Sequence, residues 1–376
     1  MYFTSQEQIR IDIISKYLSG LISREHAYNA LELGERQFRR VVKSFREKGP
    51  SSVKHGNCGQ VPKNKTSQAL ESSILQFANG KYKGFNMTHF REKLEDEKDF
   101  SQLPSYGTIR RILTENKVYS PRKKRAKRPH KSRNRYEREG IMVQIDGSHH
   151  QWFGDRKTCL IAGVDDATGK LLGAKFSETE TSLDTMDVIE QMVTTYGCFQ
   201  ILYSDKAGIY DNAKREGFTN VTRAIRQLGI TSVLANSAEA KGRIERVWGT
   251  LQDRLISEMR LRNIQTMEEA NIFLQEYIHI YNKKFSVIPA SPLSGFVPLP
   301  PGINLEKIFY TVEQRKVGSG CSIKFNNEIY IIKNNLTVSL RRLSVDIRTY
   351  RNGEKKFFIN DVEVEVEKLI RPRRVA

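Results

Sequence analysis

Features that are scarce in this sequence each remove a class of protein. The chain has 4 cysteines in 376 residues, and no two of them form a C-x-x-C pair. Such spacing argues against a disulfide framework and against a cysteine-based zinc site. There is no run of 18 or more apolar residues, and no basic segment followed by an apolar stretch at the N-terminus. The sequence therefore predicts neither a membrane span nor a secretory signal, and we expect a cytoplasmic protein, nucleoid-associated in a bacterial cell.

Acidic residues are also scarce relative to basic ones. The chain has 43 Asp and Glu against 62 Lys and Arg, which gives a formal net charge of +19. A surplus of this size costs self-repulsion unless a polyanion belongs to the working state. The length predicts two to four domains, and a mean hydropathy of −0.54 fits a folded chain. Nucleic acid is the polyanion we expect as partner.

The N-terminal part is predicted to be helical. Apolar spacing indicates three short helices within residues 6–48, the last over 35–48 with Phe38 and Val42 inward. Two helices around a Gly-containing turn, ending in a basic helix, are typical of a helix-turn-helix, which predicts a DNA-binding domain over 1–50. An ordinary bundle with a solvated charged face is the alternative. The DNA contacts would come from Arg36, Arg39, Arg40, Lys43 and Arg46.

A second helical unit is predicted over 64–117, after a linker rich in Gly, Ser, Pro and Asn. Helices are indicated over 66–78 and 86–98 and again from Ser105, with Ile109, Ile112 and Leu113 as the apolar face. We interpret this unit as a second, weaker helix-turn-helix-like DNA-binding domain. Its charge is more mixed, and its DNA contacts would be Arg110 and Arg111.

Residues 118–139 form a predicted basic linker. Within 121–138 there are ten Lys or Arg and one acid. Such a run cannot build a core and suits an arm that follows DNA phosphates, although a merely solvated linker is the alternative. The expected phosphate contacts are Arg122, Lys123, Lys124, Arg125, Lys127 and Arg128.

The pattern changes at Gly140. Three apolar strands follow, and then strands alternate with helices up to about residue 287. This order predicts a mixed α/β sheet covered by helices. Short, regularly spaced strands over 303–370 predict a small β-barrel.

Three carboxylates stand out by their position. Asp146 interrupts the first apolar strand, Asp205 ends the strand FQILYSD, and Glu245 lies early in a helix. Asp is disfavoured within strands, and a buried carboxylate needs a partner that offsets its desolvation. In so basic a chain that partner is either a salt bridge or a metal ion.

A metal ion is the sharper interpretation. Mg²⁺, or Mn²⁺, takes hard oxygen ligands, and carboxylates at one sheet edge can hold two ions roughly 3.5–4 Å apart for in-line displacement at phosphorus. This chemistry needs no side-chain nucleophile, and the sequence shows no convincing Ser/His or Cys/His arrangement. We therefore predict two ions per site.

Other acids and several cations compete for roles. Asp165 and Asp166 fit a hairpin turn, and Glu239 precedes the helix of Glu245. Lys241 and Arg243 frame the start of that helix, where they would position a phosphodiester or simply form a solvated basic face.

The segments QIDGSHHQWF, GVDDATGKLLGAKFSETET, LYSDKAGIY and NSAEAKGRIERVWGTLQDRLISEMR carry a resemblance over roughly residues 140–300. They resemble the catalytic domain of DDE transposases of the retroviral-integrase superfamily, in particular bacterial insertion-sequence transposases of the ISNCY type. The resemblance implies an RNase H-like integrase core over 140–287, with the triad on Asp146, Asp205 and Glu245. Asp205 is followed by Lys206-Ala207 rather than Asn-Gly, which leaves substrate contacts near this carboxylate open.

The resemblance also implies a function. It implies a polynucleotidyl transferase that binds terminal inverted repeats of double-stranded DNA and performs strand transfer, as a homo-oligomer on DNA. The net positive charge and the three carboxylates alone predict only a metal-dependent phosphotransferase that acts on nucleic acid. The alternatives are a non-catalytic DNA-binding regulator of the same fold and a metal-dependent nuclease without a joining step.

Overall fold

The computed structural model describes residues 2–58, 65–97, 100, 103–121, 133–211, 218–235, 241–333 and 340–369. The chain divides near Ser73 into two compact units. No helix within the described ranges is long and apolar enough to cross a bilayer. Glu239 and the predicted phosphate contacts of the basic linker lie outside these ranges: Arg122, Lys123, Lys124, Arg125, Lys127 and Arg128.

The first unit contains three helices where the periodicity predicts them. They are α1 (Ser5–Leu18), α2 (Arg24–Ala30) and α3 (Glu35–Lys48), followed by the 3-10 helix η1 (Gly49–Val53). One core joins them, built from Ile14, Ala27, Phe38, Val42 and Val53. The five cations predicted as DNA contacts on α3 are exposed. Use of this face for DNA stays a prediction.

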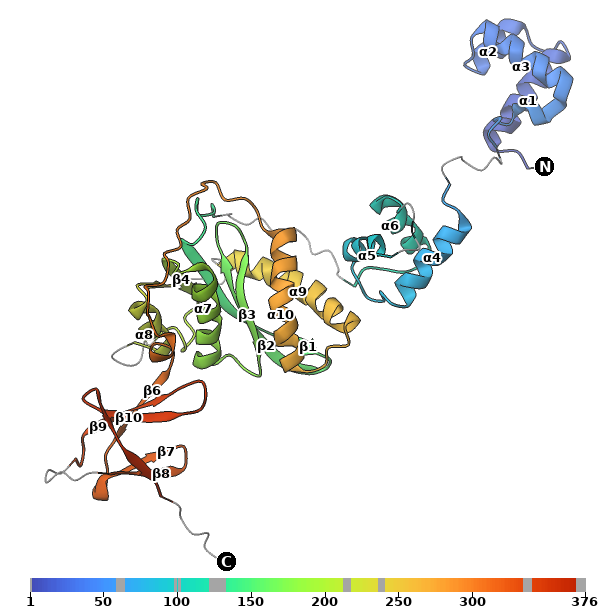
Figure 1. The fold of residues 1–376 in the computed structure, drawn as a ribbon. Coiled ribbons are helices and arrows are strands. Elements are labelled where there is room, and N and C mark those ends of the chain that lie inside the picture. The colour runs from blue at the N-terminus through green and yellow to red at the C-terminus, as the bar shows by residue number, and fades with distance from the viewer. Residues whose placement is uncertain are drawn as a thin grey trace, which may run out of the picture. The chain divides into compact units, whose positions relative to one another are not determined.

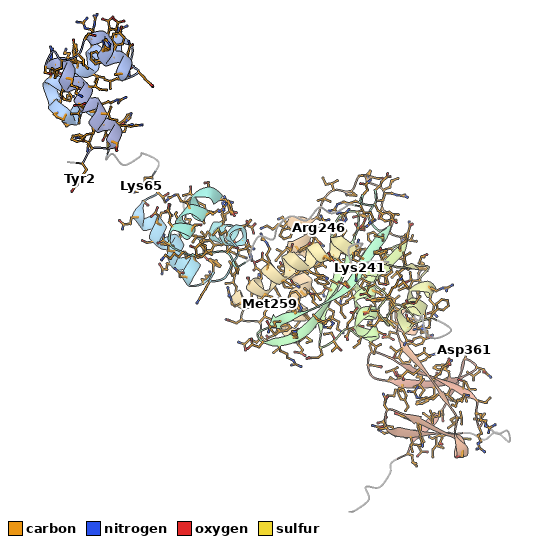
Figure 2. All side chains as sticks on the ribbon, turned by 180° about the vertical axis from the view of Figure 1, so that it is seen from behind. Tyr2, Lys65, Lys241, Arg246, Met259 and Asp361 are labelled. Atoms are coloured by element: carbon orange, nitrogen blue, oxygen red, sulfur yellow. The ribbon has the colours of Figure 1, made fainter. Side chains whose placement is uncertain are left out.

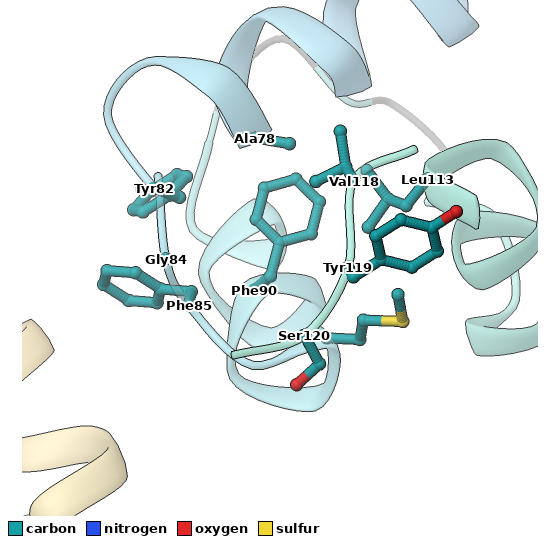
Figure 3. Close-up of a pocket in the computed structure, with 10 residues that line it drawn as sticks. Ala78, Tyr82, Gly84, Phe85, Phe90, Leu113, Val118, Tyr119 and Ser120 are labelled. Carbon is teal, nitrogen blue, oxygen red and sulfur yellow. The ribbon is translucent and has the colours of Figure 1, made fainter. Parts of the chain in front are cut away.

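Three more helices follow, α4 (Gln68–Asn79), α5 (Met87–Glu95) and α6 (Tyr106–Glu115). The apolar face of α6 is buried as predicted, while Arg110 and Arg111 are exposed. A cavity of about 20 Å³ lies among aromatic side chains that include Phe85, Phe90 and Tyr119 (Figure 3). This volume holds about one water molecule, which is too small for a substrate.

A five-stranded mixed sheet forms the centre of the second unit, in the order β3-β2-β1-β4-β5. Strand β1 pairs antiparallel with β2 and parallel with β4, and β4 pairs parallel with β5. The three strands predicted after Gly140, and the later strands predicted to alternate with helices, are present. They are β1 (Met142–Phe153), β2 (Arg156–Asp165), β3 (Leu171–Ser177), β4 (Ile201–Ser204) and β5 (Thr231–Leu234).

Helices cover both faces of this sheet (Figure 1). On one face α7 (Ser182–Tyr196) and α8 (Asn220–Gln227) pack over Val143, Ile145 and Ile161. On the other face α9 (Gly242–Leu261) and α10 (Met267–Phe285) pack over Leu160 and Phe176. A mixed sheet between helical layers fits the RNase H-like core that the sequence predicts.

The C-terminal part begins with the 3-10 helix η3 (Leu305–Lys307) and contains two small sheets. One has the order β11-β10-β9-β6 and the other β12-β8-β7, and both contribute to one apolar core. Closure of these strands into a barrel stays a prediction. The elements are β6 (Thr311–Lys316), η4 (Ser319–Cys321), β7 (Ser322–Phe325), β8 (Glu328–Ile332), β9 (Ser344–Thr349), β10 (Lys355–Ile359), β11 (Val362–Val364) and β12 (Val366–Lys368).

Candidate active site

Strand register places two of the predicted carboxylates side by side. The parallel pair β1 and β4 aligns Met142 with Ile201 and Gln144 with Tyr203. The same register, carried two residues further, sets Asp146 abreast of Asp205, just beyond the end of β4. Because side chains alternate along a strand, two residues beyond an aligned pair both point to the same face. The two carboxylates therefore meet on the side of the sheet that α9 covers.

Helix α9 is fixed to β1 by alternate polar side chains of the strand. Gln144 accepts a hydrogen bond from the backbone N–H of Ile244 at 3.3 Å. Two residues on, Asp146 accepts from the indole Nε1 of Trp248 at 2.9 Å. The first N–H groups of a helix have no partner inside the helix, and α9 has no side-chain cap at Lys241. The sheet itself thus supplies the acceptor that caps α9.

Lys241 directs its charge at both carboxylates. Its Nζ lies 2.6 Å from Oδ1 of Asp146 and 3.3 Å from Oδ2 of Asp205. Only 8% of its side chain is exposed, and Figure 2 labels it where α9 begins. Burial alone would lower the pKa of Lys241, but the hydrogen bond and charge of Asp146, with the charge of Asp205, raise it instead. The ammonium is therefore held charged between the two acids.

A third carboxylate, which the sequence analysis missed, lies against the same point from the opposite face. A Cβ placed on Gly147 would come within 2.6 Å of Oε2 of Glu180, and the phenol of Tyr210 donates to Glu180 Oε1 at 3.0 Å. Burial raises the pKa of Glu180, and the charges of Asp146 and Asp205 raise it further, against the lowering hydrogen bond from Tyr210. The site is thus more negative than Lys241 neutralises.

The sequence held one signal for Glu180. Strand β3 is antiparallel to β2, which is antiparallel to β1, so β1 and β3 run in the same direction. The residues after β3 therefore leave the sheet at the edge toward which β1 runs from Asp146, since the register sets Ser177 level with His149. An acid just before the N-cap Thr181 of α7 is an expected neighbour of that edge.

Glu245 does not join this pair. It is exposed in the first turn of α9. Among the described residues no three His, Cys, Asp or Glu side chains form a group that would hold a metal ion. The structure therefore brings Asp146 and Asp205 together and leaves the third predicted ligand outside.

The two aspartates nevertheless fit one divalent cation. Their oxygens already converge on a single cationic nitrogen, so they are at most about 6 Å apart. Asp205 Oδ1 accepts from the N–H of Ala207 at 3.0 Å, which fixes its orientation. Each carboxylate oxygen offers two lone pairs, and one donor per oxygen leaves capacity for a hard cation.

Comparison with known proteins adds the family. The chain is 32% identical to the transposase y4bF of Sinorhizobium fredii over 354 residues, which cover 92% of this chain and 77% of the relative. It is 31% identical to the transposase for insertion sequence IS1202 of Streptococcus pneumoniae over 363 residues, covering 85% and 76%. The chain belongs to the bacterial insertion-sequence transposases. No family model matches it.

Solved structures similar to this transposase have lower identity. The HTLV-2 integrase catalytic core domain in complex with magnesium is 16% identical with a TM-score of 0.32, covering 41% of this chain and 93% of that one. An intasome of simian T-cell lymphotropic virus in complex with PP2A regulatory subunit B56 gamma is 13% identical with a TM-score of 0.34, covering 81% and 100%. Both TM-scores are below 0.5, so the family assignment rests on the sequence relatives.

Cations predicted to contact DNA near the site have internal partners in this transposase. Lys241 faces the aspartates, and Arg243 lies 3.5 Å from buried Asp166 and donates to the carbonyl of Arg133 at 2.9 Å. Neither side chain is presented as a free surface charge. DNA contact through Lys241 requires its ammonium to leave Asp146.

The competing acids hold the fold together. Asp165 is fully buried and accepts from the backbone N–H groups of Gly140 and Thr168, as a turn residue does. Asp166, equally buried, accepts from the side chain of Gln144 at 3.0 Å. All their partners belong to the chain, which agrees with the turn interpretation.

Proposed function

We propose that this transposase binds the terminal inverted repeats of its own element and cuts and joins DNA strands there, using divalent ions held by Asp146, Asp205 and Glu245. The observation that supports this most is the convergence of Asp146 and Asp205 on one cationic nitrogen, in a chain of net charge +19. Carboxylates that are withdrawn from water need a cation to offset their desolvation, and carboxylate oxygens are ligands that Mg²⁺ takes.

The protein's own groups prepare the site. The N–H of Trp248 and the N–H of Ala207 each hold one carboxylate oxygen, so Asp146 and Asp205 are oriented before any ion binds. A bound Mg²⁺ or Mn²⁺ supplies Lewis-acid chemistry, lowering the pKa of the attacking water or 3′-hydroxyl and stabilising the leaving oxygen. The N-terminus of α9 favours a phosphate beside the pair.

Glu245 completes the proposed ligand set by a local movement. It lies one helical turn after Lys241, at the start of α9. An acid in a first turn is favoured by the helix dipole and is free to change rotamer when exposed. We propose that it turns toward the aspartates when ions and DNA are present.

DNA binding is proposed for the exposed cations of α3 and for the basic linker. Phosphate contacts would give affinity that falls steeply with salt. Two element ends must be held together for transposition, so we propose that the chain acts as a homo-oligomer on DNA.

The test uses purified full-length protein, Mg²⁺ and a DNA end from the flanking element. Asp205→Asn is expected to bind this end with wild-type affinity and to lose nicking and joining by about a thousandfold or more, since one ligand of the ion is lost. The control is Asp155→Asn, an exposed acid in the β1–β2 turn, which is expected to act as wild type.

Three outcomes would contradict parts of this assignment. Normal joining by Asp205→Asn overturns the metal role of Asp205. Loss of binding in the same variant indicates a folding role instead. Nicking without joining by the wild type indicates a nuclease.

A further inference from the structure

We propose that Lys241 is an internal counter-cation of the metal site: its ammonium holds Asp146 and Asp205 together before a divalent ion binds and leaves them when it binds. This inference rests on the proposed function, because it takes the two aspartates as metal ligands. It assigns Lys241 a role different from the simple DNA contact that the sequence predicts.

The burial of Lys241 supports this role. Lysine side chains are almost never buried unless they are paired. Lys241 is 8% exposed, and its partners are the two carboxylates proposed as ligands. Its charge is therefore compensated by the same oxygens that a metal ion needs.

A divalent ion between the aspartates would compete with the ammonium of Lys241 for the same oxygens. Mg²⁺ binds carboxylate oxygens at about 2.0–2.1 Å. Lys241 Nζ is 2.6 Å from Oδ1 of Asp146 and close to Asp205 as well. An ion bound between the two acids would repel the ammonium at short range, so occupancy by one cation disfavours the other.

Other cations at the start of α9 have partners of their own. Arg243 is engaged by Asp166, and Arg246 donates to the carbonyl of Gly242 at 3.2 Å. On the opposite face Glu180 adds a further carboxylate, and His149 lies close enough to influence it. Among the residues that the structure describes, Lys241 is the cation paired with both aspartates. The nearby carboxylate of Glu180 adds negative charge, which favours a divalent ion over a monovalent one.

Displacement has a consequence for substrate. The ammonium is at the first residues of α9, beside the helix N-terminus proposed to attract phosphate. Once released, Lys241 is available to the phosphodiester. Binding of the divalent ion and binding of DNA would then be coupled through the side chain of Lys241.

The experiment measures Mn²⁺ binding to full-length protein without DNA, at constant pH and ionic strength. Lys241→Gln is expected to bind Mn²⁺ about tenfold more tightly than wild type, because the competing charge is gone. Lys241→Arg is expected to bind it more weakly, because a planar guanidinium can hold two carboxylates at once. The control Arg246→Gln removes the same charge from the next turn of α9 and is expected to stay within about twofold.

The outcomes separate this inference from the proposed function. Unchanged or weaker Mn²⁺ binding by Lys241→Gln overturns the counter-cation role. If Lys241→Gln does not fold, Lys241→Arg decides: weaker binding supports the role, and equal or tighter binding overturns it. If Asp146→Asn binds Mn²⁺ as wild type does, the aspartates are not the ligands, and the proposed metal site itself fails.

Discussion

The two ends of α9, which lie near Lys241 and Met259 in Figure 2, carry opposite charge arrangements. At the start, the single cation Lys241 lies between Asp146 and Asp205. Toward the end, the single carboxylate Glu258 accepts from His89, Lys93 and Arg262 at 2.7–2.8 Å. The first arrangement has an excess of acceptors and the second an excess of donors.

This difference suggests a binding site at Lys241 and a purely structural contact, here called the tie, at Glu258. Burial alone would raise the pKa of Glu258, but donors from three side chains engage both of its oxygens and lower the pKa to about 2. His89 and Lys93 lie on α5, so Glu258 ties that helix to α9. The aspartates, in contrast, keep capacity for another cation. The partly exposed cluster at Lys241 and the buried one at Glu258 therefore have different roles, and we expect their variants to lose different properties.

The largest effect is expected for Glu245→Gln. Cleavage and joining should fall about a thousandfold or more, since a proposed ligand is lost, while Mn²⁺ binding at the aspartates persists. The free energy of unfolding should hardly change, because Glu245 is exposed. Cleavage rate and Mn²⁺ titration of the same preparation check this.

The matched control is Glu268→Gln, which removes an exposed acid from the first turn of α10. It should cleave as wild type does. Full activity of Glu245→Gln would remove Glu245 from the site and leave the aspartates as the whole ligand set.

Glu258→Gln is expected to lower the free energy of unfolding at pH 7 by about 3 kcal/mol, the size of a shift from pKa 4.5 to about 2. A carboxylate with a lowered pKa stabilises the fold above its unfolded pKa and loses this effect as pH falls toward the folded value. The difference between wild type and variant should therefore shrink from pH 4.5 down to about 2. Denaturant titration at several pH values measures it.

Glu276→Gln serves as the control for this tie. Its carboxylate is 65% exposed and lies 3.9 Å from the same Arg262, so its loss should cost about 0.5 kcal/mol or less. A Glu258→Gln variant as stable as this control would show that the tie contributes little.

The smallest effect is expected for Trp248→Phe. It removes the indole N–H that donates to Asp146 Oδ2, and the loss of this hydrogen bond should lower the free energy of unfolding by about 1 kcal/mol. The affinity for Mn²⁺ should fall by a few fold, because the carboxylate of Asp146 is less well oriented without this hydrogen bond. Calorimetric titration with Mn²⁺ measures this change.

Trp152→Phe makes the comparison specific. Its indole donates to the carbonyl of Ser148 at 3.0 Å, on the same strand but not to a carboxylate. This variant should lose similar stability and keep wild-type Mn²⁺ affinity. Equal affinity changes in both variants would mean that packing alone, rather than the hydrogen bond to Asp146, sets the site.

Much of the fold could be read from local pattern. Alternating apolar residues and turn signals locate the strands of the sheet, and helical periodicity locates α3, α6 and α10, because these signals are short-range. The position of Asp146 on a strand and of Asp205 at a strand end follows from the same reading. Both aspartates could therefore be predicted as candidate ligands from the sequence.

Contacts between residues far apart in the sequence could not be predicted in this way. The side-by-side placement of Asp146 and Asp205 depends on the register of β1 and β4, which are about 60 residues apart in sequence. The partners of Lys241 depend on how α9 docks on β1, and those of Glu258 on how α5 meets α9. Glu180, in the polar stretch SETETS, stands out only once β1 and β3 are known to run in the same direction.

Gly147 affects the electrostatic coupling between the two faces of the sheet at the site. At this residue the sheet carries no side chain on the face that meets Glu180. Only backbone therefore separates Glu180 from the side of the sheet where Asp146 and Asp205 lie. The charges of the two aspartates act on Glu180 across this backbone, so the segment that leads into α7 on the far side of the sheet is electrostatically part of the site.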